Sequence, residues 1–339
     1  MDITYILNKL LDKNALDTAE MRELMQYLMS GAATPAQTGA VLTALRAKGE
    51  SVEEVATAAT VLRELSTRIE IADEHLIDTC GTGGDARHTF NISTAAAFVA
   101  AAAGARVAKH GNRSVSSRSG SADVLEAAGV RIDLEPEHVK TCIEQVGLGF
   151  LFAQRHHGVL RNVLAVRKEI GIRTLFNLLG PLTNPAGAPN QLLGVYSADW
   201  VNPLAEVLRL LGSRHVLVVH AEDGLDEISI GAATRVAELK DGQITNYILT
   251  PEQFGLNRAS LDTLVIDSAV ASLALIQRVF QGEKGPARDI VMLNAGAALY
   301  AANVEDTLEA GIEKAGLVLD SGLALEKMQA LVKHTQAIT

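Results

Sequence analysis

The first 70 residues space their hydrophobic side chains as amphipathic helices do. One helical face carries a row of apolar side chains: Met21, Leu24, Met25 and Leu28. Three Asp, Thr or Ser residues are followed three positions later by Glu or Gln, a pattern typical of helix starts, at residues 17–20, 34–37 and 51–54. We therefore expect residues 1–70 to form a small helical domain.

From about residue 75 onward, short apolar runs alternate with helical patterns. The sequence predicts strands at residues 75–79, 106–108, 130–134, 149–153, 192–196 and 216–220. It predicts helices at residues 91–103, 121–128 and 202–211, and again from about residue 270. This alternation indicates an α/β fold with a mostly parallel, helix-covered sheet in a larger domain of residues 71–339.

Two stretches depart from the strand–helix alternation. Residues 240–243, Lys-Asp-Gly-Gln, lie between two alternating runs and predict the tight turn of an antiparallel hairpin. Residues 155–185 are helical from about residue 157 to 170 and continue into FNLLGPLTNP. We expect part of this segment to cross back to the helical domain and to act as a hinge.

Composition narrows the class of protein. The chain has 339 residues, 48% of them hydrophobic, and a net charge of −10, which argues against general binding of nucleic acid. Its two cysteines, Cys80 and Cys142, make no disulfide framework or zinc spacing and indicate a reducing cytoplasm. The N-terminus lacks a signal-peptide pattern, and no apolar run reaches the roughly 18 residues of a membrane span.

A cationic stretch stands out on this acidic chain. Residues 109–121 read KHGNRSVSSRSGS, and Asp85 is the sole acid between residues 81 and 121. Backbone amides, hydroxyls and cations at this density suit a bound phosphate. A second loop, GTGGD at residues 81–85, follows a predicted strand and precedes a helix, although an ordinary tight turn would read the same way. Two such loops suggest a ligand with more than one phosphate.

Three further groups carry candidate chemistry. NIST at residues 91–94 begins a helix, where its residues can cap the helix, bind phosphate, or divide both roles between them. Asp226 and Glu227 follow a predicted strand and offer hard oxygen ligands for Mg²⁺, though an acidic turn is the plainer alternative. Arg167, in the crossing segment with His156 and His157, suits a carboxylate, against the alternative of a solvated helix face.

Together these motifs resemble the anthranilate phosphoribosyltransferase family, of the nucleoside phosphorylase and phosphoribosyltransferase type. The resemblance rests on GTGGD, NIST, KHGNRSVSSRSGSADVLEAAG, VRKEIGIRTLFNLLGPLTNP and DGLDEIS in this order, and it covers nearly the whole chain. It implies transfer of the 5-phosphoribosyl group of phosphoribosyl pyrophosphate (PRPP) to anthranilate, the second step of tryptophan biosynthesis. It also implies two Mg²⁺ ions per subunit and a homodimer joined through the helical domain.

The resemblance also assigns residues. It implies PRPP binding by Gly81, Gly84, Asp85, Thr89, Asn91, Ile92, Ser93, Thr94, Lys109, His110, Gly111, Asn112, Arg113, Ser114, Val115, Ser116, Ser117 and Ser121. It implies anthranilate binding by Gly81, Asn112 and Arg167, with His110 and His157 nearby, and Mg²⁺ binding by Ser93, Asp226 and Glu227. Residues 158–166 depart from the family's Pro-containing pattern, which leaves the role of His157 open.

The expected mechanism needs no general base, because the nucleophile is an aromatic amine that is unprotonated at neutral pH. Lys109 and Mg²⁺ would stabilise the leaving pyrophosphate. Two alternatives remain: a pyrimidine nucleoside phosphorylase, which binds free phosphate without Mg²⁺ and has a longer chain, and a non-catalytic paralogue that binds nucleic acid. The second would show broad basic patches and eroded GTGGD or Asp-Glu motifs.

Overall fold

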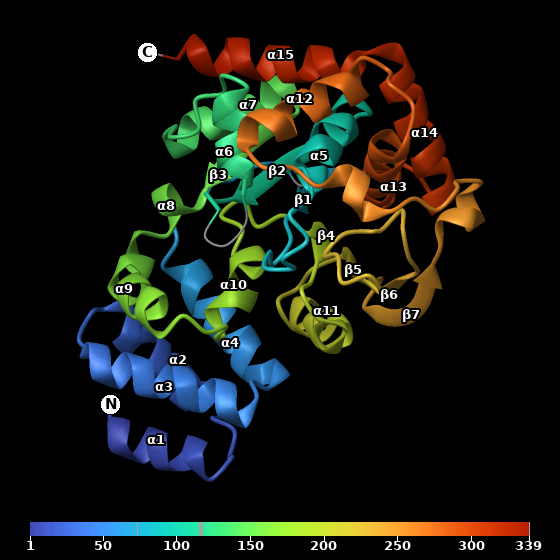
Figure 1. Ribbon diagram of the computed structural model, residues 1–339. Helices are drawn as coiled ribbons and strands as arrows, with labels where there is room; N and C mark the ends of the chain where they lie inside the picture. The colour runs from blue at the N-terminus through green and yellow to red at the C-terminus, as the bar shows by residue number, and fades with distance from the viewer. Residues whose placement is uncertain (73, 115–117, 339) are drawn as a thin grey trace.

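The N-terminal part of the chain is a group of four helices. The computed structural model describes residues 1–72, 74–114 and 118–338. The four helices are α1 (Ile3–Leu11), α2 (Thr18–Met29), α3 (Pro35–Lys48) and α4 (Val52–Glu64). The three expected capping boxes are confirmed, each with both reciprocal hydrogen bonds, at the starts of α2, α3 and α4. These helices lie at one end of the molecule, far from the C-terminal helices (Figure 1).

A seven-stranded sheet forms the centre of the larger part. Its strands are β1 (Leu76–Thr79), β2 (Arg106–Gly111), β3 (Leu148–Phe152), β4 (Asn190–Gly194), β5 (His215–Ala221), β6 (Thr234–Lys240) and β7 (Gln243–Leu249). The strand order is β3-β2-β1-β4-β5-β6-β7, and the first five run parallel. Strands β6 and β7 are antiparallel and close the sheet on one side. The α/β class is therefore confirmed.

Helices cover both faces of the sheet (Figure 1). The first face packs against α5 (Ile92–Ala102), α6 (Ser121–Ala127), α7 (Pro136–Val146), α12 (Ala269–Phe280), α13 (Pro286–Ala301), α14 (Leu308–Ser321) and α15 (Leu323–Gln336). Helix α5 is itself covered by α13 and α15, and Phe98 on α5 meets Phe280 on α12 with ring centroids 6.1 Å apart. The second face packs against α10 (Phe176–Leu182) and α11 (Val201–Leu210), whose core is continuous with that of α1–α4.

The segment 155–185 lies against the N-terminal helices. It begins in α8 (Ala153–His156), makes a 3₁₀ turn at residues 158–160, and continues through α9 (Arg161–Ile170) and α10. The helix expected from residue 157 to 170 is thus broken at its start. Helix α9 packs on α2 and α3, and the Asn162 side chain donates to the Met29 carbonyl at 2.6 Å.

One predicted strand is wrong. Residues 130–134 bury every second side chain, as a strand would, but they pair with no strand of the sheet. The amide of Arg131 donates instead to the Thr335 hydroxyl of α15 at 3.2 Å. The alternation reflects an extended connection that is buried on one side under a helix, which a two-residue period cannot distinguish from a strand.

The remaining strands and helices confirm the predictions with shifted ends. Strand β2 continues to Gly111 because it pairs with β3 as far as Phe152, so Lys109 and His110 belong to the strand and not to the loop. The hairpin turn between β6 and β7 has positive φ at both central residues, Asp241 and Gly242, as a type I′ turn requires. Among the described helices, none is long and apolar enough to cross a membrane.

Candidate functional site

The strand order reverses between β1 and β4, and the candidate site lies there. After β1 the chain moves outward to β2 and β3, then returns to β4 on the other side of β1. In open parallel sheets, ligands bind at the carboxyl ends of the strands beside such a reversal. The GTGGD loop leaves β1 at this point, and its Thr82 amide donates to the Gly194 carbonyl at the end of β4, at 2.8 Å.

The glycines of this loop allow it to touch the acidic turn after β5. A Cβ atom on Gly81 would lie 3.0 Å from Oδ2 of Asp226 and 3.3 Å from the Gly194 carbonyl oxygen. The Gly83 amide donates to the same Asp226 Oδ2 at 2.9 Å, and Gly83 has a φ of 65°. The structure therefore brings two of the predicted groups, GTGGD and the acidic pair, into direct contact.

The start of α5 faces the second carboxylate of this pair. The amide of Ser93 donates to Oε1 of Glu227 at 3.1 Å. The carboxylate thus accepts from one of the N–H groups that have no partner within the helix at its N-terminus. The hydroxyl of Ser93 receives a hydrogen bond from Nζ of Lys109 at 3.3 Å. Three predicted groups, from α5, β2 and the turn after β5, thus meet at one place.

Lys109 is a buried cation at the centre of this arrangement. Its side chain is 2% exposed, and Nζ donates to the carbonyl and hydroxyl oxygens of Thr79 as well as to Ser93. Among the described residues, no carboxylate forms an ion pair with it within 4 Å. An ammonium held by neutral oxygens keeps its charge available for an anionic ligand.

Burial and mutual repulsion disfavour the charged forms of the acidic pair, Asp226 and Glu227. Burial, with repulsion from Asp85 and Glu227, raises the pKa of Asp226 well above its usual value. Burial also raises the pKa of Glu227 to about 7, although Lys109 and the Ser93 amide oppose the shift. A divalent cation would relieve this crowding, and carboxylate and hydroxyl oxygens are the ligands that Mg²⁺ prefers. Ser93, Asp226 and Glu227 therefore fit the expected metal.

Asn91 joins the basic loop, the part of the cationic stretch 109–121 that follows β2, to the helices of the first face. It begins α5 but makes no capping bond with its side chain. Its Oδ1 accepts from the hydroxyls of Ser119, at 2.9 Å, and of Ser272 on α12, at 2.7 Å, and its Nδ2 donates to the Ser119 carbonyl at 3.2 Å. Asn91 therefore anchors the far end of the basic loop.

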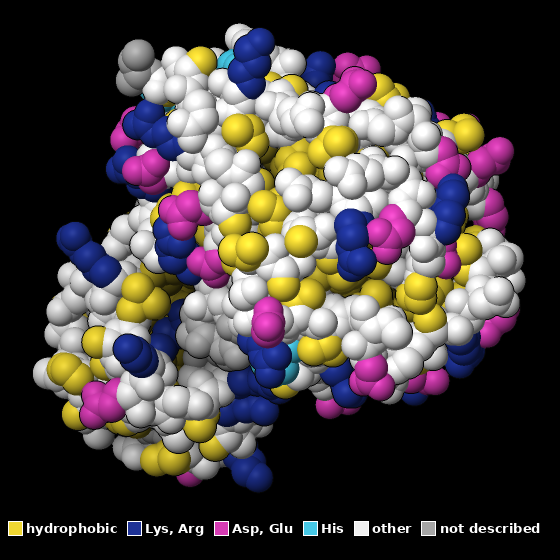
Figure 2. Space-filling view, turned by 45° about the horizontal axis from the view of Figure 1, so that its top comes forward, with side chains coloured by type: hydrophobic (Ala, Val, Ile, Leu, Met, Phe, Trp, Pro, Cys, Tyr) yellow, Lys and Arg dark blue, Asp and Glu magenta, His cyan; other side chains and the backbone are white. Residues whose placement is uncertain are grey.

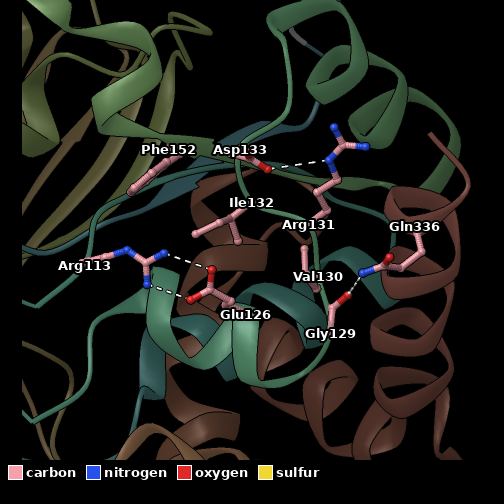
Figure 3. Close-up of a pocket in the computed structure, with 9 residues that line it drawn as sticks. All are labelled: Arg113, Glu126, Gly129, Val130, Arg131, Ile132, Asp133, Phe152 and Gln336. Carbon is pink, nitrogen blue, oxygen red and sulfur yellow. Dashed lines mark hydrogen bonds and ion pairs between the residues drawn. The ribbon is translucent and has the colours of Figure 1, made fainter. Parts of the chain in front are cut away.

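Arg113 points away from the other predicted residues. Its guanidinium binds Glu126 at 2.8 and 3.0 Å and Asp123 at 3.1 Å. Figure 3 shows it at one side of a separate pocket that Phe152 and Arg131 also line. This pocket has a volume of about 380 Å³ and is lined by no other predicted site residue among the described residues. The structure does not bring Arg113 to the reversal of strand order between β1 and β4.

The remaining predicted PRPP residues differ in how much of each a ligand can reach. Ile92 and Thr94 are buried, so Ile92 could offer a ligand only its backbone. Gly111 has no room for a side chain, because a Cβ would lie 2.2 Å from the Ser121 hydroxyl. Others are half-buried or exposed: Gly84, Asp85, Thr89, Asn112, Ser114 and Ser121. Val115, Ser116 and Ser117 lie outside the described residues.

Arg167 is the cation predicted to bind anthranilate. It lies on α9 with its guanidinium 5.1 Å from the Phe176 ring centroid, and burial lowers its pKa. Within residues 1–72, 74–114 and 118–338, no carboxylate pairs with it. A half-buried guanidinium beside an aromatic ring suits an aromatic carboxylate.

His110 and His157 lie beside each other. Their rings make an edge contact with centroids 5.2 Å apart, which joins β2 to the crossing segment. Burial lowers the pKa of His110 to about 3 and that of His157 to about 4, so both are neutral at physiological pH. The structure thus brings these two histidines together but gives no contact between them and Arg167.

Sequence reasoning missed Arg173. Its guanidinium donates to the Gly84 carbonyl and lies 4.4 Å from the Tyr196 ring centroid. It therefore ties the crossing segment to the GTGGD loop. The only sequence signal was its place within VRKEIGIRTLFNLLGPLTNP, which does not separate it from its neighbours. On the surface, Lys and Arg side chains gather along the boundary between the small and large parts (Figure 2).

Two family models match the chain, one for each part. The helical bundle domain of the glycosyl transferase family matches residues 4–66, and the a/b domain of that family matches residues 73–325. Both matches agree with the observed order of a helical part followed by a helix-covered sheet.

Named relatives match over almost their full length. The anthranilate phosphoribosyltransferase of Methylococcus capsulatus is 64% identical over 98% of this chain and 97% of its own. The solved enzyme of the same name from Thermus thermophilus has a TM-score of 0.93 at 45% identity, covering 98% of this chain and 99% of its own. The enzyme from Saccharomyces cerevisiae, in complex with PRPP and Mg, has a TM-score of 0.90 at 26% identity, covering 99% and 98%.

Proposed function

The chain belongs to the anthranilate phosphoribosyltransferase family, and we propose that the residues at its sheet reversal carry out the reaction of that family. The 5-phosphoribosyl group of PRPP passes to the amine of anthranilate, and pyrophosphate leaves. The observation that carries the proposal is the meeting of Lys109, Ser93 and Glu227 at one point. The relatives named above favour this reading over the phosphorylase and the nucleic-acid-binding alternatives.

The protein's part in the chemistry is electrostatic. The bond from the ribose C1 to pyrophosphate breaks, a bond from C1 to nitrogen forms, and the amine releases one proton to solvent. Lys109, held among neutral oxygens, stabilises the charge that grows on the leaving oxygen. Mg²⁺, when bound by Ser93, Asp226 and Glu227, supplies further neutralisation of the pyrophosphate.

Loop amides and hydroxyls hold the phosphates in this proposal. Gly81, Gly84, Asp85, Thr89 and Thr94 lie on the β1–α5 side, and Asn112, Ser114 and Ser121 lie on the loop after β2. Arg113 is available for a phosphate only if it leaves Glu126 and Asp123, to which it is bound here. Its assignment, like that of the whole set, is a proposal.

Arg167 is proposed to clamp the anthranilate carboxylate, which leaves the amine directed toward Gly81 and Asn112. Its support is the missing carboxylate partner among the described residues and the aromatic face of Phe176 beside it. Positioning of the two substrates is then the protein's second contribution to the rate.

Replacing Arg167 tests this clamp. We expect Arg167→Ala to raise the KM for anthranilate roughly 10- to 100-fold, the worth of a charge-assisted hydrogen bond. The KM for PRPP should stay within about twofold. Arg161→Ala, an exposed arginine on the same helix, serves as the matched control. Steady-state kinetics with each substrate varied in turn gives both constants, and equal increases in the two KM values would contradict the clamp.

Three broader features also remain proposals. We propose two Mg²⁺ ions per subunit, of which the acidic pair holds one, and the oxygen donors described above support this. We propose a homodimer through the helical part, where Tyr5 and Leu11 of α1 are exposed apolar side chains. A cytoplasmic location is supported by two free cysteines, Cys80 and Cys142.

A further inference from the structure

Three side chains with different ligand atoms lie together beneath the GTGGD loop. Asp78 is in β1, Cys80 follows that strand directly, and His110 is in β2. The pairing of Ile77 with Val107 sets the register, so Cys80 continues it opposite His110, and Asp78 lies two residues earlier on the same face. One potential ligand atom from each residue lies within 4.8 Å of the other two.

The imidazole of His110 is arranged as a ligand. Its Nδ1 lies 3.0 Å from the Gly180 carbonyl oxygen, which can only accept, so Nδ1 carries the proton. Its Nε2 therefore carries a lone pair, and that atom is buried with no hydrogen-bond partner among the described residues. A backbone carbonyl that fixes the tautomer in this way is the usual support of a metal-bound histidine.

Asp78 has a similar unused atom. Its Oδ1 accepts from the His110 amide at 3.1 Å, while its Oδ2 is buried and accepts no hydrogen bond in the described part of the chain. The side-chain amide of Asn184 lies near this carboxylate but donates to the Ala108 carbonyl at 2.8 Å. The side chains of Asp78 and His110 are 1% and 3% exposed. Buried polar atoms are nearly always hydrogen-bonded, so two adjacent exceptions need an explanation.

The donor set selects the class of ion. Nitrogen, sulfur and carboxylate oxygen together suit Zn²⁺ and related thiophilic cations, whereas Mg²⁺ prefers oxygen alone. A carboxylate and a thiolate balance a divalent charge, so the occupied site is neutral, as a buried site must be. Cys80 is half-buried, and burial raises the pKa of its thiol, so an ion that binds here must displace the thiol proton, which passes to solvent.

We propose that Asp78, Cys80 and His110 form a binding site for a thiophilic divalent cation such as Zn²⁺, distinct from the oxygen-lined site at Ser93, Asp226 and Glu227. The ring of His157 packs edge-on against that of His110 and helps to hold the imidazole in position. An ion here lies next to Gly81 and fixes His110 at the start of the basic loop. Binding therefore inhibits the transferase.

Cobalt spectroscopy tests the site without relying on turnover. The probe is Co²⁺, added to the protein in excess Mg²⁺, with the thiolate-to-cobalt charge-transfer band as the signal. The chain has two cysteines, which makes Cys142→Ala the matched control for Cys80→Ala. We expect the band in wild type and in Cys142→Ala, its loss in Cys80→Ala, and its displacement by one equivalent of Zn²⁺. A missing band in wild type, or an equal band in Cys80→Ala, would overturn the proposal.

Inhibition separates this site from the magnesium site. At saturating Mg²⁺ and PRPP, we expect Zn²⁺ to inhibit wild type. The Zn²⁺ concentration for half-maximal inhibition should be at least about tenfold higher in Cys80→Ala, because one ligand is lost. Additional Mg²⁺ should not restore the rate. Inhibition that is equal in both proteins and relieved by Mg²⁺ would place Zn²⁺ at the acidic pair and sink the proposal. Basal activity of Cys80→Ala should match wild type, because its thiol lies outside the proposed transfer machinery.

Discussion

At the scale of single residues, the candidate site contains two carboxylates whose charged forms are disfavoured by burial and by neighbouring negative charge. Asp226 accepts a hydrogen bond from the Gly83 amide and Glu227 accepts one from the Ser93 amide. Burial, and after it the charge of Asp85, still raises the pKa of both carboxylates. A bound Mg²⁺ would convert this repulsion into attraction, and we propose that the carboxylates act on catalysis through the metal.

Removing one carboxylate charge should therefore weaken metal dependence specifically. We expect Glu227→Gln to raise the Mg²⁺ concentration for half-maximal rate by roughly 10- to 100-fold. Glu222→Gln, an exposed acid on the same turn, is the control and should leave that concentration unchanged. Initial rates over a Mg²⁺ titration give the answer. An unchanged midpoint in Glu227→Gln would remove this residue from the set of metal ligands.

The sequence predicted residue types better than residue partners. KHGNRSVSSRSGS predicted a cationic loop, and Lys109 does lie beside Ser93 and Glu227. It could not show that Arg113 binds Glu126, because that pairing depends on how α6 turns back after the loop. The Asp78, Cys80 and His110 cluster was missed for the same reason, since parallel strands bring distant residues together in a register that no local pattern contains.

At the scale of elements, helix α12 positions the start of α5. Ser272 on α12 is fully buried, and its hydroxyl both donates to Oδ1 of Asn91 and accepts from the Asn91 amide. Asn91 in turn holds Ser119 at the end of the basic loop. A helix outside the sheet thus sets the position of the loop that we propose to bind phosphate.

Removing the Ser272 hydroxyl should loosen that loop. We expect Ser272→Ala to raise the KM for PRPP several-fold and leave the KM for anthranilate unchanged, because two hydrogen bonds to Asn91 are lost at about 1 kcal/mol each. Ser272→Thr keeps a hydroxyl and should restore the PRPP constant. Protease cleavage within residues 113–120, followed with and without PRPP and Mg²⁺, reports the loop directly. A fall in Tm with both KM values unchanged would show that Ser272 only stabilises the fold.

A polar cluster around Glu238 joins strands β5–β7 to α13 and makes the stability of the fold depend on pH. Burial alone would raise the pKa of Glu238, but hydrogen bonds from His215, Tyr300 and Tyr247 outweigh it and lower the pKa to about 2. The folded value lies below the unfolded value of about 4.3, so the carboxylate stabilises the fold above that pH. This contribution is lost as the pH falls toward 2.

The Glu238→Gln variant should show the loss. At neutral pH, its free energy of unfolding should be lower than that of wild type by roughly 3 kcal/mol, in line with the pKa shift. Between about pH 5 and pH 2.5 the two proteins should converge, because wild type loses its carboxylate contribution there. Thermal unfolding across this range measures the difference, and parallel curves would exclude the linkage.

Element prediction succeeded where a local signal exists. Capping boxes fixed the starts of α2, α3 and α4, and Asp241-Gly242 fixed the hairpin. It failed at residues 130–134, where the alternation comes from the cover of α15 and not from strand pairing. The tertiary partner of a segment, which decides between these outcomes, is not written in the segment itself.

At the scale of the whole molecule, the helical part exposes apolar side chains that a partner could cover. Leu11 is 68% exposed at the end of α1. If the proposed dimer uses this end, Leu11→Glu should shift the mass in sedimentation equilibrium from dimer toward monomer. Leu317→Glu on α14, where the leucine is 65% exposed, is the control and should leave the mass unchanged. A dimer that survives Leu11→Glu would move the interface elsewhere.

The cover over α5 has a consequence for synthesis on the ribosome. Helix α5 is synthesised early, whereas α13 and α15, which bury its outer side, are synthesised near the end. Phe98 on α5 likewise gains its contact with Phe280 only after α12 has been synthesised. A nascent chain that ends near β7 therefore exposes the apolar surface of α5 to solvent. The α1–α4 group has much of its own packing by then. The larger part completes its core only after the final helices appear, and during this interval its exposed apolar surface favours aggregation unless a chaperone covers it.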